Sequence, residues 1–178
     1  MSELNLVPIY LADRHHILDR LGVALERTFQ TTVRIRKPWF DPEVSFDRSR
    51  GQYNSTVLLK LLLDDTADSS GKVLGVVGVD LFAPVFTYVF GEAQLDGRAS
   101  VVSLHRLRPD VYGLTADDHL LFTRLLKESV HELGHCFGLL HCAEPACVMH
   151  ASTYVEEIDV KSEWFCRYCQ TAVRSTPE

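Results

Sequence analysis

The segment H-E-L-G-H-C-F-G-L-L-H, residues 131–141, constrains this chain more than any other part of its sequence. His131 and His135 are four residues apart, so on a helix their imidazoles point the same way and can bind one ion at about 2.0–2.1 Å. Gly138 accepts backbone angles that other residues avoid, so the chain can turn there and bring His141 to the same ion. The segment therefore predicts a helix that ends at a metal site.

Glu132 lies about 100° round the helix from His131, because 3.6 residues make one turn. Its carboxylate is then beside the ion rather than on it, where a general base can take a proton from metal-bound water. Three neutral imidazoles leave one position of a tetrahedral Zn²⁺ open for that water, whose pKa such sites lower to about 7. We therefore expect a catalytic zinc ion held by His131, His135 and His141, with Glu132 as the base.

Four of the five cysteines lie from residue 142 onward, at the spacings C-x4-C and C-x2-C. Four thiolates at such intervals are typical of closed structural zinc sites, which leave no position for a substrate. We expect them to bind a second zinc ion that ties the C-terminal helix to the loop carrying His141. They are Cys142, Cys147, Cys166 and Cys169. Two disulfides or four free thiols are the alternatives.

Two other residues near the motif have plainer interpretations. Cys136 remains outside both groups, and we interpret it as a small core residue rather than a ligand or redox switch. His150 could compete for metal, but with three histidines already available we interpret it as a loop residue. His15 and His16 are interpreted as solvated positions in the first helix.

The first half of the chain alternates between strand-like and helix-like periods. Segments 4–11, 32–37 and 72–82 indicate strands, the last fully buried, and segments 13–29 and 55–65 indicate helices between them. Such alternation predicts a mostly parallel sheet with crossover helices.

Residues 85–94 and 99–107 are two further strand candidates, joined across a turn signal at Asp96 and Gly97. They predict an antiparallel hairpin at the edge of the sheet, which makes the sheet mixed. The segment 85–90, V-F-T-Y-V-F, alternates as an edge strand does. Such an edge can accept an extended peptide as an added strand, or it can be covered by a loop.

Three helix starts are marked by polar residues. Thr115 and Asp118 resemble a capping box before a helical pattern that runs to Gly138. Asp13 is a plausible N-cap of the first helix, and Asp159 of a terminal helix over 160–175.

The full pattern H-E-x-x-H-x-x-G-x-x-H-C-x4-C-x-M, followed by C-x-x-C, ends at residue 169. It resembles the zinc signature of the metzincin metallopeptidases, and most closely that of the archaemetzincins. The resemblance implies the same three histidine ligands and the same base, and it adds Met149 as an apolar floor beneath the metal. Many metzincins have a tyrosine two residues after this methionine. Here that position is Ala151, and Tyr154 is the nearest candidate.

The motifs and the resemblance together predict an α/β, metzincin-like fold. A mixed, mainly parallel sheet of about five strands packs on two helices, with the active-site helix crossing beneath it. We expect 1–178 to form one metallopeptidase domain. Residues 1–138 are the sheet-and-helix part, and residues 139–178 are a small C-terminal part stapled by the four-cysteine site.

The function expected is zinc-dependent hydrolysis of peptide bonds in peptides or proteins, by Glu132-assisted attack of zinc-bound water. The same ligands serve endopeptidases and aminopeptidases, so both remain open. The alternative is a zinc-stabilised module that binds peptides or proteins with little or no turnover.

Composition argues against other classes of partner. The net charge of -6 and the lack of a Lys/Arg run longer than 34–37 argue against nucleic acid, including a nucleic-acid module built on the four cysteines. No apolar run approaches the roughly 20 residues that span a membrane, and the N-terminus has no basic region typical of signal peptides. We therefore expect a cytoplasmic protein without a membrane partner.

Overall fold

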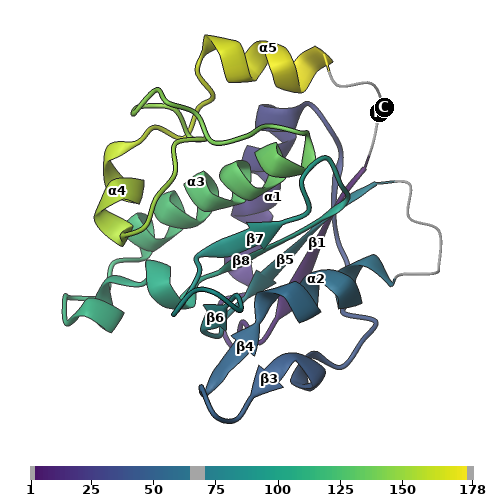
Figure 1. Ribbon diagram of the computed structural model, residues 1–178, viewed down its shortest axis with the longest axis vertical. Coiled ribbons are helices and arrows are strands. Elements are labelled where there is room, and N and C mark those ends of the chain that lie inside the picture. Colours follow the sequence, from purple (N-terminus) through teal and green to yellow (C-terminus); the bar gives the residue numbers. More distant parts are fainter. Residues whose placement is uncertain (1–2, 65–70, 176–178) are drawn as a thin grey trace.

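The computed structural model describes residues 3–64 and 71–175, and its central element is a five-stranded sheet. In sheet order the strands are β2 (Val33–Ile35), β1 (Leu4–Ile9), β5 (Lys72–Val77), β8 (Ala99–Ser103) and β7 (Gly91–Ala93). Neighbouring strands pair in parallel, except that β7 pairs with β8 antiparallel at the edge (Figure 1). The predicted mixed, mainly parallel sheet is confirmed.

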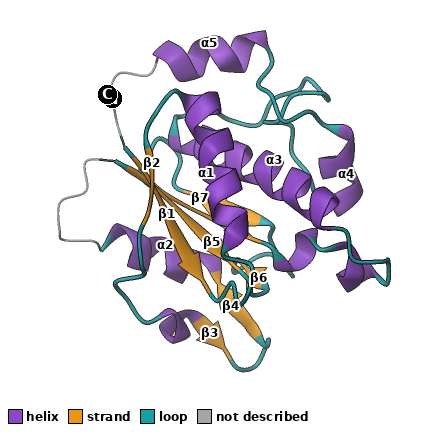
Figure 2. Ribbon diagram, turned by 180° about the vertical axis from the view of Figure 1, so that it is seen from behind, coloured by secondary structure: helices purple, strands orange, loops and turns teal. Residues whose placement is uncertain are grey.

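Helices cover both faces of this sheet (Figure 1, Figure 2). Helices α1 (His16–Phe29) and α3 (Asp118–Cys136) share one core with Leu74 and Val76 of β5. Helix α2 (Ser55–Leu63) shares a second core with Val73 and Val77 of the same strand. Successive side chains of a strand point to opposite faces, so the continuous apolar run of β5 serves both cores.

A second, small sheet was not predicted. It has the order β3 (Phe46–Asp47), β4 (Gln52–Asn54) and β6 (Leu81–Phe82). The predicted strand over 72–82 is therefore wrong in its length, because the chain leaves the main sheet after Val77 and pairs with β4 from Leu81 onward. Gly78 lies at the break, against the backbone of Tyr10, where a side chain would not fit.

The segment 85–90 forms turns instead of the predicted edge strand, and only residues 91–93 of that prediction are strand. Its single ladder contact is an isolated antiparallel bridge from Val89 to Leu81. The carbonyls of Phe86 and Thr87 accept hydrogen bonds from the Arg50 guanidinium at 2.8 and 3.1 Å, so a side chain takes the place of a neighbouring strand. Three 3-10 helices complete the connections: η1 (Pro42–Ser45), η2 (His105–Leu107) and η3 (Pro109–Tyr112).

The predicted caps of the first and third helices are wrong by a few residues. Helix α1 follows His15, which makes no side-chain cap, so Asp13 lies outside the helix start. Helix α3 is capped by Asp117, whose side chain accepts from the Leu120 N–H at 2.9 Å, rather than by Thr115. The predicted helix over 55–65 ends at Leu63, and its last residue lies outside the described ranges.

The terminal helix begins later than predicted, because two helices replace one. These are α4 (Val155–Val160) and α5 (Arg167–Ser175). Asp159 is inside α4 and caps nothing. Its carboxylate accepts two hydrogen bonds from the Arg124 guanidinium of α3, at 2.8 and 2.7 Å. The C-terminal segment is thus held on α3, and its Met149, Ile158 and Phe165 enter the core of α1 and α3.

Among residues 3–64 and 71–175, no helix has the length and apolar character needed to cross a membrane.

Lys72 of strand β5 connects the C-terminal end of α3 to the sheet by hydrogen bonds. Its ammonium donates hydrogen bonds to the carbonyls of Cys136 at 2.7 Å and Gly97 at 3.0 Å, and it lies 4.3 Å from the centre of the Phe137 ring. A cation at a helix C-terminus also interacts favourably with the helix dipole.

We predict that Lys72→Met lowers the free energy of unfolding by about 1–3 kcal/mol, because the carbonyls of buried Cys136 and half-buried Gly97 lose a charged donor. Urea denaturation of the zinc-loaded protein measures it. The matched control is Lys60→Met on the exposed side of α2, which should change stability by less than about 0.5 kcal/mol. Equal changes in the free energy of unfolding for the two variants would contradict a stabilising role of the Lys72 hydrogen bonds.

Candidate metal centre and cleft

The last turns of α3 bring the three predicted histidines together. His131 and His135 lie on one side of the helix, with their Nε2 atoms 3.1 Å apart. Gly138 then has φ +82°, a left-handed conformation that favours glycine, and the chain turns back to place His141 beside them. One nitrogen of each ring lies within 4.8 Å of the others. Nitrogens that bind one tetrahedral zinc ion lie about 3.3 Å apart, so this arrangement fits the metal.

Hydrogen bonds orient two of the rings. The Nδ1 atoms of His131 and His135 lie 2.8 Å from the Val148 carbonyl and 2.7 Å from the Leu139 carbonyl. A carbonyl only accepts, so each Nδ1 carries the proton and each Nε2 lone pair is left for a metal. Burial lowers the pKa of all three imidazoles, that of His131 most, and Lys161 lowers it further. Neutral rings are the form that binds metal.

Glu132 is packed against the edge strand. Its side chain is buried, and a Cβ atom added at Gly91 would come within 2.6 Å of its Oε1 atom. Gly91 therefore provides the space in which this carboxylate lies next to the histidines. Burial, with a smaller effect from Glu128, raises the pKa of Glu132 well above its usual value. A carboxylate with a raised pKa is a stronger base, which suits proton transfer near neutral pH.

Met149 packs against helix α3 in a space that Gly134 provides. Met149 is fully buried, and a Cβ atom added at Gly134 would overlap its Sδ atom and lie 3.3 Å from the Phe165 ring. This role of Gly134 was not predicted from the sequence. A glycine in a helix interior lowers helix stability by roughly 1 kcal/mol relative to alanine. The presence of Gly134 inside a predicted helix was therefore the sequence signal that another group packs closely there.

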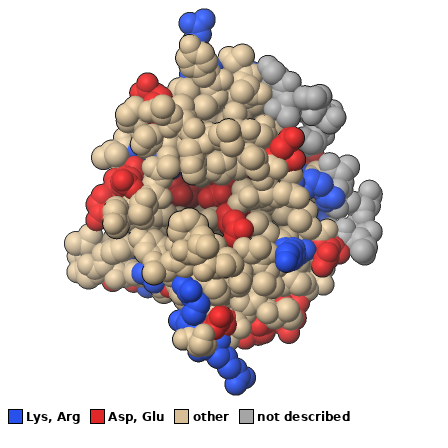
Figure 3. Space-filling model, viewed as in Figure 1, with Lys and Arg blue, Asp and Glu red and all other residues tan. Residues whose placement is uncertain are grey.

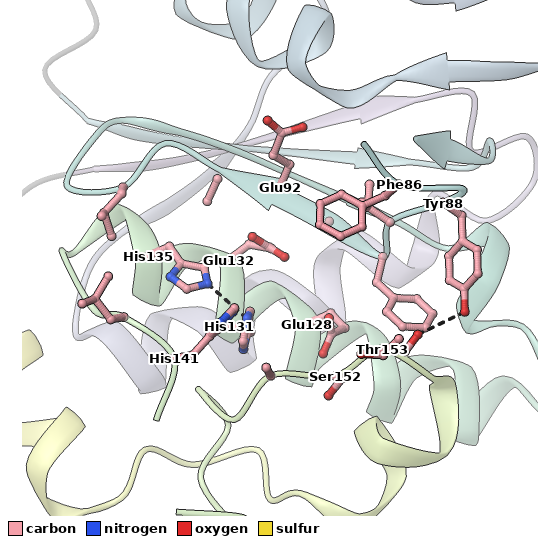
Figure 4. A pocket seen from close by; sticks show the side chains of 17 residues that line it. Phe86, Tyr88, Glu92, Glu128, His131, Glu132, His135, His141, Ser152 and Thr153 are labelled. Atoms are coloured by element: carbon pink, nitrogen blue, oxygen red, sulfur yellow. Dashed lines mark hydrogen bonds between the residues drawn. The ribbon is translucent and has the colours of Figure 1, made fainter. Parts of the chain in front are cut away.

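A cavity of about 520 Å³ opens over this group. Its upper rim is β7 with the loop before it, its lower rim includes Leu140 and residues 151–153, and α3 forms its floor. The Tyr88 hydroxyl donates to the Thr153 carbonyl at 3.1 Å and joins the two rims (Figure 4). Tyr88 was not predicted as a site residue. Tyr154 is 62% exposed and does not line the cavity, whereas Ala151 does.

The cavity is acidic. Figure 3 shows acidic side chains within the hollow that crosses the viewed face of the molecule. Those that line the cavity are Glu92, Glu128 and Glu132, and among the described residues no lysine or arginine lines it. The Glu92 carboxylate turns away toward α2, where it accepts from Ser55 and Thr56. Glu128 and Glu132 remain as the acids on the floor (Figure 4).

The four predicted cysteines form a second group. One sulfur from each lies within 4.8 Å of the others, and the Cys142 and Cys166 sulfurs are 3.8 Å apart. Thiolates bound to one tetrahedral zinc ion at 2.3 Å are also about 3.8 Å apart, so the group fits zinc. All four are free cysteines, and 3.8 Å is far longer than a disulfide bond. The Cys169 backbone N–H lowers the pKa of the Cys166 thiol to about 7, which favours the thiolate form.

The other predicted residues lie outside both groups. Cys136 is fully buried, its thiol donates to the Ala99 carbonyl at 3.3 Å, and burial raises its pKa to about 12. The Nδ1 atom of His150 is 2.9 Å from the Cys142 carbonyl. His15 and His16 are exposed at the start of α1.

Residues 40–175 match the family model for Peptidase family M54. The chain belongs to this family. An archaemetzincin from Methanocaldococcus jannaschii is 44% identical over 128 residues, which cover 72% of this chain and 69% of that protein. An archaemetzincin from Archaeoglobus fulgidus is 38% identical over 165 residues, covering 92% of this chain and 95% of the relative.

Solved structures agree with this membership in M54. The crystal structure of the Methanopyrus kandleri archaemetzincin has a TM-score of 0.85 at 35% identity, covering 98% of this chain and 94% of that one. The Archaeoglobus fulgidus archaemetzincin, complexed with malonate, has a TM-score of 0.81 at 34% identity, covering 96% and 99%. The predicted family and fold class are confirmed. As an M54 peptidase the protein is a zinc metallopeptidase, with peptides or proteins as substrates.

We predict that Gly134→Ala lowers the free energy of unfolding by about 1–3 kcal/mol, because the new methyl group displaces Met149 from a packed core. The matched control is Gly22→Ala in helix α1, where the nearest atom to an added Cβ is 3.4 Å away. That change should stabilise the protein by up to about 1 kcal/mol. Chemical denaturation of both zinc-loaded variants measures the difference, and a Gly134→Ala protein as stable as Gly22→Ala would contradict the packing described.

Proposed function

We propose that this metallopeptidase hydrolyses peptide bonds at the group formed by His131, His135 and His141, with Glu132 as the general base. One observation carries the proposal. Three Nε2-bearing rings converge on the floor of a cleft, and a buried carboxylate lies beside them. Zinc bound there would supply Lewis-acid chemistry, polarising the peptide carbonyl and making a water molecule more acidic.

The residues of the chain would do the rest. Glu132 would take a proton from the attacking water and later return it to the leaving amine, so one carboxylate acts first as base and then as acid. Gly91 keeps this carboxylate close to the histidines, since a larger residue would displace it. Strand β7 is an edge strand of the main sheet, so its outer edge can bind an extended peptide by backbone hydrogen bonds. The predicted peptide-accepting edge thus moves from residues 85–90 to residues 91–93.

We further propose that the cysteine group binds a second, structural zinc ion. Such an ion would link Cys142 and Cys147, in the loop after His141, to Cys166 and Cys169 at the start of α5. It would hold residues 139–178 on the sheet-and-helix part, 1–138, within a single domain. Free thiols at all five cysteines suit a reducing compartment, and we propose that the protein acts in the cytoplasm.

We predict that Glu132→Gln reduces peptide hydrolysis by about 10²–10⁴-fold while zinc content stays unchanged, because the amide cannot accept the proton. A fluorogenic peptide library gives the rate, and mass spectrometry of the metal gives the zinc content. Glu156→Gln, an exposed charge change on α4, is the control and should retain the parental rate.

Hydrolysis by Glu132→Gln at the parental rate would disprove the assigned base. The alternative of a binding module without turnover predicts that the parent protein shows no Glu132-dependent hydrolysis at all, so the same comparison separates the two functions.

For the second site we predict that Cys166→Ser lowers the zinc content from two ions per chain to one, since a neutral hydroxyl is a poor zinc ligand. Cys136→Ser, outside both groups, should keep two. Metal analysis after dialysis against a weak chelator measures both. A parent protein that holds a single zinc ion, or a Cys166→Ser protein that holds two, would contradict the second site.

A further inference from the structure

Glu128 occupies the base of the cleft next to the reacting groups. It lies one helical turn before Glu132 on α3, so the two side chains are neighbours on the same face of the helix. Figure 4 shows Glu128 between the histidines and the contact of Tyr88 with Thr153. The proposed reaction gives Glu128 no role, although its side chain is only 5% exposed and lines the cavity.

A buried lysine is paired with this carboxylate. The Lys161 ammonium lies 2.8 Å from Glu128 Oε1, and its side chain is fully buried. The geometry of this contact does not satisfy a hydrogen bond, and Oε1 has no other hydrogen-bond partner among residues 3–64 and 71–175. The attraction is therefore coulombic. Oε1 is buried against Lys161, so it is Oε2, for which no hydrogen bond is found among the described residues, that keeps the capacity to accept a donor from the cavity. Lys161 itself also donates to the His150 carbonyl at 3.3 Å.

The position of Glu128 relates it to one part of a substrate. In the proposed reaction Glu132 returns a proton to the leaving amine, so that amine must lie next to the Glu132 carboxylate. The residue that contributes the amine, the one that follows the cleaved bond, therefore lies beside Glu132. Glu128, four residues or about 6 Å from Glu132 toward the N-terminus of α3, is then within reach of that residue's side chain.

The walls of this part of the cleft favour a long side chain with an apolar stem. Phe86, Tyr88 and Phe90 line it with aromatic rings, and the rings of Tyr88 and Phe90 are 5.6 Å apart. Aromatic faces also attract cations. An acidic side chain would meet the carboxylates of Glu128 and Glu132, which among the described residues have one ammonium between them, that of Lys161 beside Glu128.

We propose that Glu128 makes this peptidase selective for lysine or arginine immediately after the cleaved bond. The inference rests on the proposed function. A lysine or arginine side chain can donate hydrogen bonds to the Glu128 carboxylate. The methylene groups of the same side chain then pack against the aromatic rings. An apolar side chain of equal length covers the carboxylate without pairing it, and a site built to pair a polar group discriminates strongly against such an analogue.

The test compares peptides that differ only at the residue after the cleaved bond. Lysine, its uncharged analogue norleucine, and glutamate are placed there. We expect kcat/KM for the lysine peptide to exceed that for the norleucine peptide by about 10-fold or more, with the glutamate peptide slowest. Equal values for lysine and norleucine, with hydrolysis present, would overturn the selectivity and leave the proposed function standing.

A double variant removes the selectivity without leaving a buried charge unpaired. Glu128→Leu with Lys161→Met replaces the ion pair by apolar side chains, which proteins tolerate far better than the loss of one partner. It should fold, cleave the norleucine peptide, and lose the preference for lysine. Glu156→Gln, at an exposed side chain that does not line the cavity, should keep it. A double variant that still prefers lysine 10-fold would also overturn the inference.

Binding gives a readout that does not depend on turnover. Calorimetry with the zinc-loaded Glu132→Gln protein should show the lysine peptide bound about 10-fold more tightly than the norleucine peptide, and equal affinities would overturn the inference. If the parent cleaves no peptide, the proposed function fails, and these affinities alone decide whether Glu128 recognises a cation.

Discussion

The backbone turn that ends helix α3 is the constraint on which the site depends. The Gly138 N–H bonds to the His135 carbonyl at 2.9 Å, the Leu139 N–H to the Gly134 carbonyl at 3.0 Å, and the same His135 carbonyl accepts from Asp96 at 2.9 Å. This double use of one carbonyl joins the helix end to the turn of the β7–β8 hairpin. These bonds fix the position of the edge strand relative to His131 and His135 on the helix and to His141 after the turn, and the cleft forms between them.

A polar row on α3 holds the C-terminal segment against this helix. Arg124 bonds Asp159, the Lys127 ammonium donates to the Ile158 carbonyl at 2.9 Å, and Glu128 pairs with Lys161. Buried ion pairs add little net stability, but a mismatched partner leaves a charge uncompensated at high cost. The row therefore selects one placement of the segment on α3. That placement matters because the segment supplies Met149, which packs against Gly134 of α3, and the lower rim of the cleft.

Local features of the sequence were predictable, and features made by distant partners were not. The histidine group follows from spacing within eleven residues and one glycine, and the order of strands and helices follows from periodicity. The strand predicted over 85–90 failed because its alternation serves a loop whose carbonyls bond Arg50, far away in sequence. Glu128 was not predicted as a site residue, because its partner Lys161 lies outside helix α3. Helical periodicity gives no information about ion pairs between separate segments. The error at Asp159 has the same origin, since its carboxylate bonds Arg124 of α3 and caps no helix, whereas the caps of α1 and α3 were misplaced by only two residues each.

The central claim is that three imidazoles hold one ion with a position left open toward the cleft. Anomalous X-ray diffraction at the zinc absorption edge, from crystals grown with zinc at neutral pH, tests it most directly. We expect one peak about 2.0–2.1 Å from the Nε2 atoms of His131, His135 and His141, with no fourth protein ligand. Zinc found elsewhere with these rings unoccupied, or a peak whose fourth ligand is a side chain of the protein, would contradict it.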